Sequence, residues 1–369
     1  PGAVAVAMPG KYDRDGRRRY ETITFRELDY DSDRVARGLA ALGVTPGTRL
    51  ALLVKPSIEF ILLTFGLLKS GAVPILIDPG MGRTNLLKCL DEARPAGFVA
   101  IPVVQAIRTL LFRRYREARH NVTVGRKLFW DGVTLDELIL RGGRGPALAD
   151  TRRDSPAAII FTTGSTGPPK GVLYTHGNFD AQVEQLREFY GIEPGEVNLP
   201  GFPLFALFDA AMGVTTVVPD MDPTRPAQVD PPKILEAARH GHGPEALAFG
   251  SPAIWNRVGR YCQDHGTRLE TVQPVLSAGA PVPAHVLAGM LASIHPEGNI
   301  HTPYGATESL PVASISGREV LAETAARTAA GAGTCVGRRF SGINWQVIRI
   351  VEGPIESLAQ IEPLPTGEI

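Results

Sequence analysis

The chain has 369 residues, more than one ordinary hydrophobic core accommodates, so two or three subdomains are expected. Hydrophobic residues make up 44% and charged residues 21%, a composition that excludes a disordered chain. The 38 Lys and Arg residues balance the 38 Asp and Glu residues, so no overall charge attracts the protein to nucleic acid or to an anionic bilayer.

The first part of the chain alternates helical and strand patterns. A helix is predicted from Phe25, because apolar residues then recur at helical spacing until a glycine ends it (Leu28, Val35, Leu39, Leu42 and Gly43). Short apolar runs at residues 49–54 and 73–77 predict strands, and between them Ser57 can cap a second helix. Helices that alternate with buried strands indicate a layered α/β domain with a mostly parallel sheet.

No membrane-spanning segment is expected. The most apolar stretch, residues 60–77, is broken by Lys69, Gly71 and Pro74, and it therefore predicts a buried helix followed by a strand. The first residues lack the basic start of a signal peptide. The three cysteines lie far apart without CxxC spacing, which favours a cytoplasmic protein and gives no sign of a zinc site.

Residues 105–127 are unusually basic. They hold seven Arg and Lys residues and one acid, Glu117. Two interpretations stay open, a solvated basic helix and a site for a partner protein or an acidic surface.

The domain organisation follows from composition. Residues 142–156 are rich in Gly, Pro and charge and predict a linker. We therefore expect a first α/β subdomain over residues 1–150 and a second over 151–334, with the start of a β-rich subdomain over 335–369. In this last part residues 344–351 alternate as a strand does, and the final residues 365–369 resemble the beginning of another strand, so further chain is expected downstream.

The most informative stretch is AAIIFTTGSTGPPKGVLYTH, residues 157–176. An apolar strand leads into glycines, hydroxyl residues and a lysine, and a second strand pattern comes at once. Backbone N–H groups of such a loop can close on an anion, and the lysine adds a point charge. The stretch therefore predicts a polyphosphate-binding loop.

A Walker A loop is excluded by the residues on either side of the lysine. That loop needs Gly-Lys followed by Ser or Thr and then a helix whose N-terminus faces the phosphates. Here Lys170 comes after two prolines, precedes Gly171 and leads into a strand. The helix starts later, with Asn178 as its predicted cap, and reaches about Tyr190. The loop is therefore predicted to join two strands.

These residues resemble the phosphate loop of the adenylate-forming superfamily, which includes acyl-CoA synthetases, luciferases and peptide-synthetase adenylation domains. Similar segments occur at Gly66–Val73 with Asp78-Pro79, at SAGAP (277–281), at YGATE (304–308) and at the final residues. The resemblance implies the large N-terminal domain of such an enzyme, with two α/β subdomains and the start of a small β-barrel-like one. It also implies that a downstream Asp and a small C-terminal domain carrying a lysine lie beyond this chain.

The resemblance assigns ATP and Mg²⁺ to named residues. Tyr304 offers a flat face to the purine, Thr307 a donor to the α-phosphate, and Glu308 a hard oxygen ligand for Mg²⁺. Lys170, Thr307 and Glu308 are the predicted catalytic residues. The remaining predicted ATP contacts are Thr162, Thr163, Gly164, Ser165, Thr166, Gly167, Gly279, Ala280, Pro281, Gly305 and Ala306.

The acyl substrate is assigned to the segment LPGFPLFALFDAAMG (199–213). Its aromatic residues predict an apolar site for a long chain, with Phe202, Phe205, Phe208 and Asp209 as the substrate residues. Acyl-CoA synthetases commonly have PLFH here, whereas Ala206 follows Phe205 in this chain, which indicates an altered gate. Core packing is the alternative role for each of these aromatic residues.

Taken together, these motifs resemble most the β-lactone-forming synthetases of bacterial long-chain olefin biosynthesis. This resemblance implies ATP-dependent activation of a long-chain 2-alkyl-3-hydroxy acid, attack by its own hydroxyl, and other enzymes of an olefin pathway as partners. His176, His301 and Asp209 are candidates by residue type for a base that assists the hydroxyl. A long-chain acyl-CoA or acyl-AMP ligase, an amino-acid substrate bound through Asp209, and a regulatory relative without catalysis stay open as alternatives.

Overall fold

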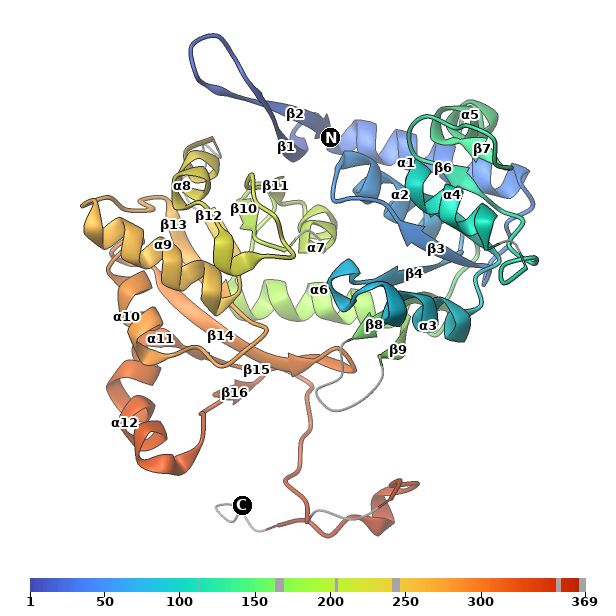
Figure 1. Cartoon of the computed structure of the whole chain (residues 1–369). Coiled ribbons are helices and arrows are strands. Elements are labelled where there is room, and N and C mark those ends of the chain that lie inside the picture. The colour runs from blue at the N-terminus through green and yellow to red at the C-terminus, as the bar shows by residue number, and fades with distance from the viewer. Residues whose placement is uncertain (112, 163–168, 203–204, 241–245, 350–352, 365–369) are drawn as a thin grey trace.

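The computed structural model describes residues 1–111, 113–162, 169–202, 205–240, 246–349 and 353–364 (Figure 1). Two sheets form the centres of two lobes, and helices pack around each. The long helix α6 (His176–Tyr190) contacts β9 of one sheet and β15 of the other, so it joins the lobes. The fold is an α/β fold, as the alternating patterns predicted.

The first sheet has seven strands in the order β7-β6-β5-β3-β4-β8-β9. All its described pairings are parallel except that of β8 with β9. Its strands are β3 (Arg49–Leu53), β4 (Val73–Ile77), β5 (Gly97–Ala100), β6 (Val122–Thr123), β7 (Val133–Thr134), β8 (Pro156–Thr162) and β9 (Lys170–Thr175).

The second sheet has nine strands in the order β16-β15-β14-β13-β12-β10-β11-β1-β2. Its centre is parallel, and β2, β15 and β16 run antiparallel to their neighbours. Its strands are β1 (Val4–Tyr12), β2 (Arg18–Thr24), β10 (Val197–Pro200), β11 (Thr215–Val217), β12 (Ala246–Gly250), β13 (Val272–Ser277), β14 (Asn299–Ala306), β15 (Ser309–Ser316) and β16 (Arg338–Arg339).

The helices cover the two sheets. In the first lobe they are α1 (Phe25–Ala41), α2 (Ile58–Lys69), α3 (Arg83–Ala93), α4 (Pro102–Leu110) and α5 (Leu135–Gly142). Those that come after α6 are α7 (Phe205–Met212), α8 (Pro231–His240), α9 (Pro252–Asp264), α10 (Ala284–Leu291), α11 (Gly317–Glu319) and α12 (Ala325–Arg327).

The first helices form as predicted, and their caps explain where they begin. The Thr24 side chain accepts a hydrogen bond from the Glu27 backbone while Glu27 reaches back, a capping box that starts α1. Ser57 caps α2. Gly43, with φ of +84°, ends the first helical segment in a conformation that favours glycine. The apolar faces of both helices are buried against the first sheet.

The strands do not follow the predicted boundary at residue 150. β8 and β9 lie beyond it but extend the first sheet, because β8 pairs in parallel with β4. The N-terminal hairpin of β1 and β2 belongs to the second sheet, where β1 pairs with β11. The stretch 143–155 is irregular as expected, yet it returns the chain to the same sheet. Strand pairing between distant segments, which composition does not reveal, decides this arrangement.

The strand predicted over residues 344–351 does not form within its described part. Ile348 makes only an isolated bridge to Pro363, flanked by one backbone hydrogen bond on each side. Proline has no N–H to donate to a ladder, which limits pairing at this point. Residues 350–351, like the final residues 365–369, lie outside the described residues.

The basic segment is not one helix. α4 ends at Leu110, and turns occupy much of the described stretch 113–118. Tyr115 and Ala118 fold back into a buried apolar cluster with Phe98, which a continuing helix with a solvated surface would not allow. Among the described residues, no helix is long and apolar enough to cross a membrane.

Candidate active site

The predicted phosphate hairpin consists of β8 and β9. The two strands pair antiparallel, with Phe161 opposite Gly171 and Thr162 opposite Lys170. The strand–loop–strand arrangement is therefore confirmed. Lys170 is exposed at the first position of β9, at the mouth of the loop. The predicted contacts Thr163, Gly164, Ser165, Thr166 and Gly167 lie outside the described residues.

Gly171 explains how tightly this hairpin is packed. A Cβ at this position would lie 3.0 Å from the Phe161 ring and 3.1 Å from the Ile159 side chain. Glycine leaves that space to the two apolar side chains of β8, so the two strands can pack closely at the residue that follows Lys170.

The helix after the hairpin begins earlier than predicted. Thr175 is its N-cap and accepts a hydrogen bond from the Asn178 backbone, and the Asn178 side chain accepts from the Thr175 backbone. Asn178 is thus the reciprocal partner of the cap and not the cap itself. The two residue types can exchange these roles because both have a side-chain oxygen that accepts.

The YGATE motif forms the end of a β-hairpin. Tyr304, Gly305 and Ala306 are exposed at the end of β14, and Ala306 faces Ser309 of β15. Thr307 and Glu308 are therefore the two residues of the turn. The Glu308 carboxylate is exposed, and among described residues it makes no hydrogen bond or ion pair.

Two side chains that the sequence did not point to connect the β14–β15 hairpin to β9 and to α6. The Tyr174 hydroxyl of β9 donates to the Thr307 carbonyl over 2.5 Å, although the residues are 133 apart in the chain. Gln182 of α6 donates to the Leu310 carbonyl over 2.9 Å. Burial raises the pKa of Tyr174, and the nearby Glu308 charge adds to this effect. The only sequence signal was a tyrosine with a polar tip in the strand that follows the loop.

The predicted adenine segment lies at the same end of the second sheet. β13 and β14 are parallel neighbours, so their carboxyl ends share one edge of the sheet. Gly279, Ala280 and Pro281 come after β13 as an exposed loop, and Gly279 has a φ of +93° with open space around it. The edge therefore places this loop beside the strand that carries Tyr304.

Two hydroxyl groups at this edge have unused hydrogen-bonding capacity. Ser277 ends β13 and Ser251 follows β12, and their buried Oγ atoms have no hydrogen-bond partner among described residues. Buried hydroxyls are usually hydrogen-bonded, so an unpartnered pair at the carboxyl ends of parallel strands is suited to a polar ligand.

The aromatic residues of the predicted acyl segment form one chain of contacts. Phe205 stacks on Phe249 with ring centroids 3.5 Å apart, and it also contacts Phe202 and Phe208. Phe208 continues to Phe179, which stacks on Tyr174. The aromatic row thus connects the end of β10 to the hairpin. Phe202 is 39% exposed, whereas Phe205 and Phe208 are half-buried against a core cluster. Pro203 and Leu204 lie outside the described residues.

The predicted substrate role of Asp209 does not agree with its surroundings. Its carboxyl is fully buried and accepts hydrogen bonds from Asn198 over 2.7 Å and from Thr216 over 2.8 Å. Burial raises the pKa of Asp209 to about 7, although both hydrogen bonds act in the opposite direction. Both oxygens of Asp209 are thus bonded inside the core, where the side chain connects α7 to β10 and β11 and is not accessible to an ammonium group.

Ala206 is also part of the core. It is fully buried in the apolar cluster of α1 and α2, so in this structure it is not at the mouth of a channel. The helical repeat of α7 explains both corrections, because Ala206 and Asp209 are three residues apart and share its inward face.

Burial disfavours the charged form of the two histidines named as candidate bases. Burial lowers the pKa of His176, and it also lowers the pKa of His301, against weaker opposite effects of Asp180 and Glu319. His301 packs edge-on against Tyr190 within the β14 region. The His176 Nε2 atom is buried and has no partner among described residues.

The donor set fits Mg²⁺ bound together with a nucleotide. No group of three or more His, Cys, Asp or Glu side chains in the described ranges could hold a metal ion by itself. Mg²⁺ commonly binds through one or two carboxylates together with substrate phosphates. Glu308, a single exposed carboxylate in the turn beside the phosphate hairpin, can serve as such a ligand.

A two-lobed α/β fold in which such a hairpin faces a YGATE turn defines the large domain of adenylate-forming enzymes. The family described as AMP-binding enzyme matches residues 1–356, and this chain belongs to it. Among solved structures, it is similar to the amide bond synthetase McbA from Marinactinospora thermotolerans, with a TM-score of 0.77, 22% identity and coverage of 100% of this chain and 67% of that one. It is also similar to the long-chain-fatty-acid-CoA ligase FadD1 from Archaeoglobus fulgidus, with a TM-score of 0.76, 19% identity and coverage of 99% and 70%.

Two curated relatives are more similar in sequence. The chain is 46% identical over 372 residues to the olefin beta-lactone synthetase of Stenotrophomonas maltophilia, covering 100% of this chain and 66% of the relative. It is also 46% identical to the olefin beta-lactone synthetase of Xanthomonas campestris pv. campestris, covering 100% and 65%. The chain thus spans slightly less than two thirds of the length of these relatives.

Proposed function

We propose that the protein containing this chain activates a long-chain 2-alkyl-3-hydroxy fatty acid with ATP and closes it to a β-lactone. Two relatives with 46% identity over the whole chain are olefin beta-lactone synthetases, which supports this choice within the family. The observation that carries the ATP-dependent step is the Tyr174–Thr307 hydrogen bond, because it holds the phosphate hairpin and the YGATE turn together.

In the first step, a carboxylate oxygen of the acid attacks the α-phosphorus of ATP and pyrophosphate leaves. The chain contributes mainly positioning and charge neutralisation. Lys170 and the loop from Thr162 hold the β- and γ-phosphates, Thr307 donates to the α-phosphate, and Tyr304 with the 279–281 loop holds the adenosine. When bound through Glu308, Mg²⁺ supplies further neutralisation of the phosphate charge.

In the second step, the 3-hydroxyl oxygen attacks the activated acyl carbon, AMP leaves, and the hydroxyl proton is released. Nucleophile and electrophile belong to one molecule, so the reaction needs no external thiol. The aromatic row from Phe202 to Phe208 provides the apolar surface for the alkyl chains.

The proposal extends to the cellular location and the partner enzymes of the protein. The enzyme acts in the cytoplasm, with other enzymes of an olefin pathway as its partners. The chain contributes the nucleotide-binding large domain of that enzyme.

The test compares a 2-alkyl-3-hydroxy acid with its 3-deoxy analogue, using full-length protein, ATP and Mg²⁺. Both acids should release pyrophosphate, because their carboxylates react alike. Only the hydroxy acid should then release AMP and a cyclic ester detectable by mass spectrometry, while the deoxy acid remains as acyl-AMP.

Coenzyme A distinguishes the remaining alternatives. If both acids turn over only with coenzyme A and yield thioesters, the protein is an acyl-CoA ligase. If ADP and phosphate are the direct products, adenylation itself is refuted.

A further inference from the structure

α4 has an unusual distribution of polar and apolar side chains. Its sequence, PVVQAIRTL, contains three apolar residues that point outward, Val103, Ile107 and Leu110, with exposures of 58%, 49% and 77%. They lie four and three residues apart and so form one stripe along the helix. The polar residues Gln105 and Arg108 are buried on the opposite side. The helix therefore shows its apolar stripe to solvent.

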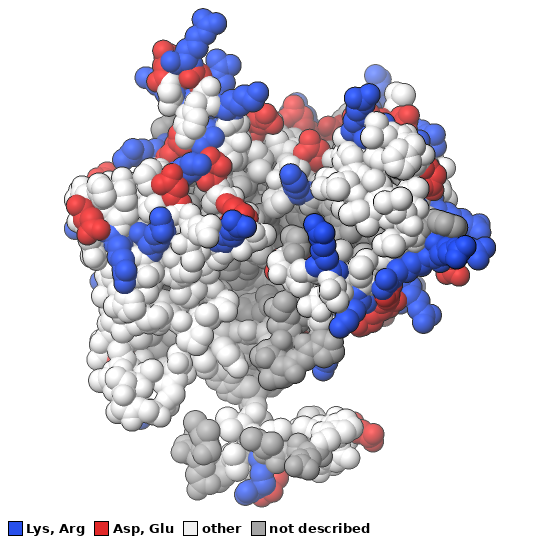
Figure 2. Space-filling model, in the orientation of Figure 1, with Lys and Arg blue, Asp and Glu red and all other residues white. Residues whose placement is uncertain are grey.

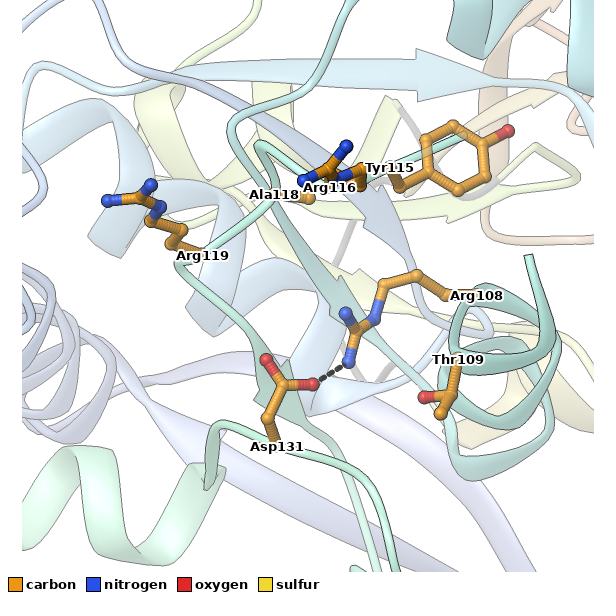
Figure 3. A pocket seen from close by; sticks show the side chains of 7 residues that line it. All are labelled: Arg108, Thr109, Tyr115, Arg116, Ala118, Arg119 and Asp131. Carbon is orange, nitrogen blue, oxygen red and sulfur yellow. Dashed lines mark hydrogen bonds and ion pairs between the residues drawn. The ribbon is translucent and has the colours of Figure 1, made fainter. Parts of the chain in front are cut away.

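Specific hydrogen bonds hold the helix in this orientation. The Gln105 amide donates to the carbonyls of Phe98 and Val122, over 3.1 and 2.9 Å. Arg108 donates to Gln105 and pairs with Asp131, as Figure 3 shows for the ion pair. Rotating α4 to bury its apolar stripe would leave these buried polar groups without partners, which is unfavourable. The exposed stripe is therefore a stable feature of the fold.

A neighbouring segment extends the apolar surface. Leu128 and Phe129 are 56% and 72% exposed, although the adjacent Trp130 is buried and donates to Thr123 over 2.9 Å. The same segment approaches the start of α4 at Gly125, where an added Cβ would lie 3.7 Å from Pro102. This proximity puts a second group of exposed apolar residues near the N-terminal end of α4, and clustered exposed apolar residues mark interaction sites on soluble proteins.

Cations flank the apolar residues. The segment 105–127 has seven Arg and Lys residues and one acid. Within it, Arg108 and Arg114 form ion pairs with Asp131 and Asp91, and Lys127 donates to the Gly132 carbonyl. Among the described residues, no carboxylate forms an ion pair with Arg116 or Arg119, which line an open hollow of about 370 Å³ together with the paired Arg108 and Asp131. Figure 2 shows several Lys and Arg side chains at this edge of the lobe, with Asp and Glu side chains among them.

We propose that this face, the α4 stripe with Leu128, Phe129 and the surrounding arginines, docks on the surface of an anionic lipid bilayer. An apolar helix face with a cationic border is the pattern of interfacial binding, in which the apolar side chains enter the acyl boundary and the cations bind headgroup phosphates. A second copy of the chain fits less well, because it would bring the same cations against each other. Such docking does not depend on the proposed reaction.

The experiment measures binding of full-length protein to vesicles without substrate. The protein should sediment with vesicles of phosphatidylglycerol and phosphatidylcholine, bind weakly to pure phosphatidylcholine, and dissociate as salt increases. The pair Ile107→Ser/Leu110→Ser should weaken binding at least about tenfold. The pair Arg116→Gln/Arg119→Gln should weaken it about fivefold for each charge.

Matched controls change exposed residues of the same types elsewhere. Leu140→Ser/Leu148→Ser removes two apolar side chains that are 76% and 83% exposed, and Arg144→Gln/Arg152→Gln removes two exposed cations. Both control pairs should bind vesicles as the unmodified protein does. Failure to bind anionic vesicles, or equal loss in test and control pairs, overturns the proposal.

A fluorescent probe keeps the test independent of how well the serine pairs fold. With the exposed Cys335 replaced by Ser, a polarity-sensitive dye attached at Leu110→Cys should shift to the blue with anionic vesicles, and one at Leu140→Cys should not. If the Leu110 dye already reports an apolar environment without vesicles, the face is covered by another part of the protein or by a second copy. Light scattering separates these two cases, and either result refutes lipid docking.

Discussion

Replacing Tyr174 with Phe tests whether the two parts of the candidate site are held together as the structure indicates. Phe keeps the ring that stacks on Phe179, with centroids 5.1 Å apart, and removes only the hydroxyl that donates to the Thr307 carbonyl. A lost hydrogen bond that leaves a partly buried partner unsatisfied costs about 1–2 kcal/mol. If this energy positions Thr307 and Glu308 for catalysis, adenylation should slow about 5- to 30-fold.

The assay is pyrophosphate release by full-length enzyme over a range of Mg²⁺ concentrations. Because Glu308 follows Thr307 directly, Tyr174→Phe should raise the Mg²⁺ concentration needed for half-maximal rate as well as lower the maximal rate. A change in stability alone would not shift the Mg²⁺ dependence, so this measurement identifies Tyr174 as a positioning residue.

Tyr190→Phe is the matched control. The Tyr190 hydroxyl bonds Ser314 of β15 over 3.0 Å, so its loss also removes one hydrogen bond between the α6 region and the β14–β15 hairpin, but away from the turn. Tyr190→Phe should lose about as much free energy of unfolding as Tyr174→Phe, but its rate of pyrophosphate release should change less than about twofold. Unchanged activity and Mg²⁺ dependence in Tyr174→Phe, or the same loss in both variants, would refute the reasoning.

Further substitutions test individual assignments. Lys170→Ala and Glu308→Gln should each lower adenylation about thirtyfold or more, the scale of a lost electrostatic contact worth ~2 kcal/mol, and wild-type rates in folded variants would show that the site is misplaced. The pKa of Asp209 is about 7 in the folded protein and 3.8 in the unfolded chain. The folded state therefore binds the proton more tightly, so this contribution to the free energy of unfolding is complete below pH 3.8 and is lost as pH rises to 7. The stability of the natural protein relative to Asp209→Asn should therefore fall on the order of 2–4 kcal/mol between pH 4 and 8 in denaturant titrations, and a constant difference would contradict the raised pKa. Gly171→Ala should lower the free energy of unfolding by about 1–3 kcal/mol, because its Cβ would crowd the Phe161 ring, and an unchanged denaturation midpoint would disprove that packing.

Much of the local structure could be predicted from sequence because it depends on neighbours along the chain. The helices that begin at Phe25 and after Ser57 follow from apolar spacing and capping residues, and the structure confirms both. The two prolines and the glycine around Lys170 excluded a helix, and β9 confirms the strand that was expected instead. The residues of the YGATE turn were likewise identified by type and order alone.

The tertiary structure decided everything that depends on contacts between distant segments. Asp209 has the residue type of a substrate ligand, but its contacts with Asn198 and Thr216 make it a buried structural acid. Tyr174 meets Thr307 across 133 residues, a pairing that no local period could indicate. The sequence showed the basic residues that follow α4, but not that Gln105 and Arg108 are buried while Val103, Ile107 and Leu110 are exposed.

The physical reason is that the periodicity of residue types shows which residues share a face of a helix or strand, but not which other elements pack against that face. Burial of Gln105 and Arg108 in α4 is favourable only because Phe98, Val122 and Asp131 provide their partners. In the same way, β8 joins the first sheet by pairing with β4, and β1 joins the second by pairing with β11, both over long separations in the sequence. Sequence by itself determined the first helices, the strand after Lys170 and the residue types of the loops. The pairing of distant edges and polar groups determined which side of each element is inside and where patterns such as that of residues 344–351 fail to form a strand.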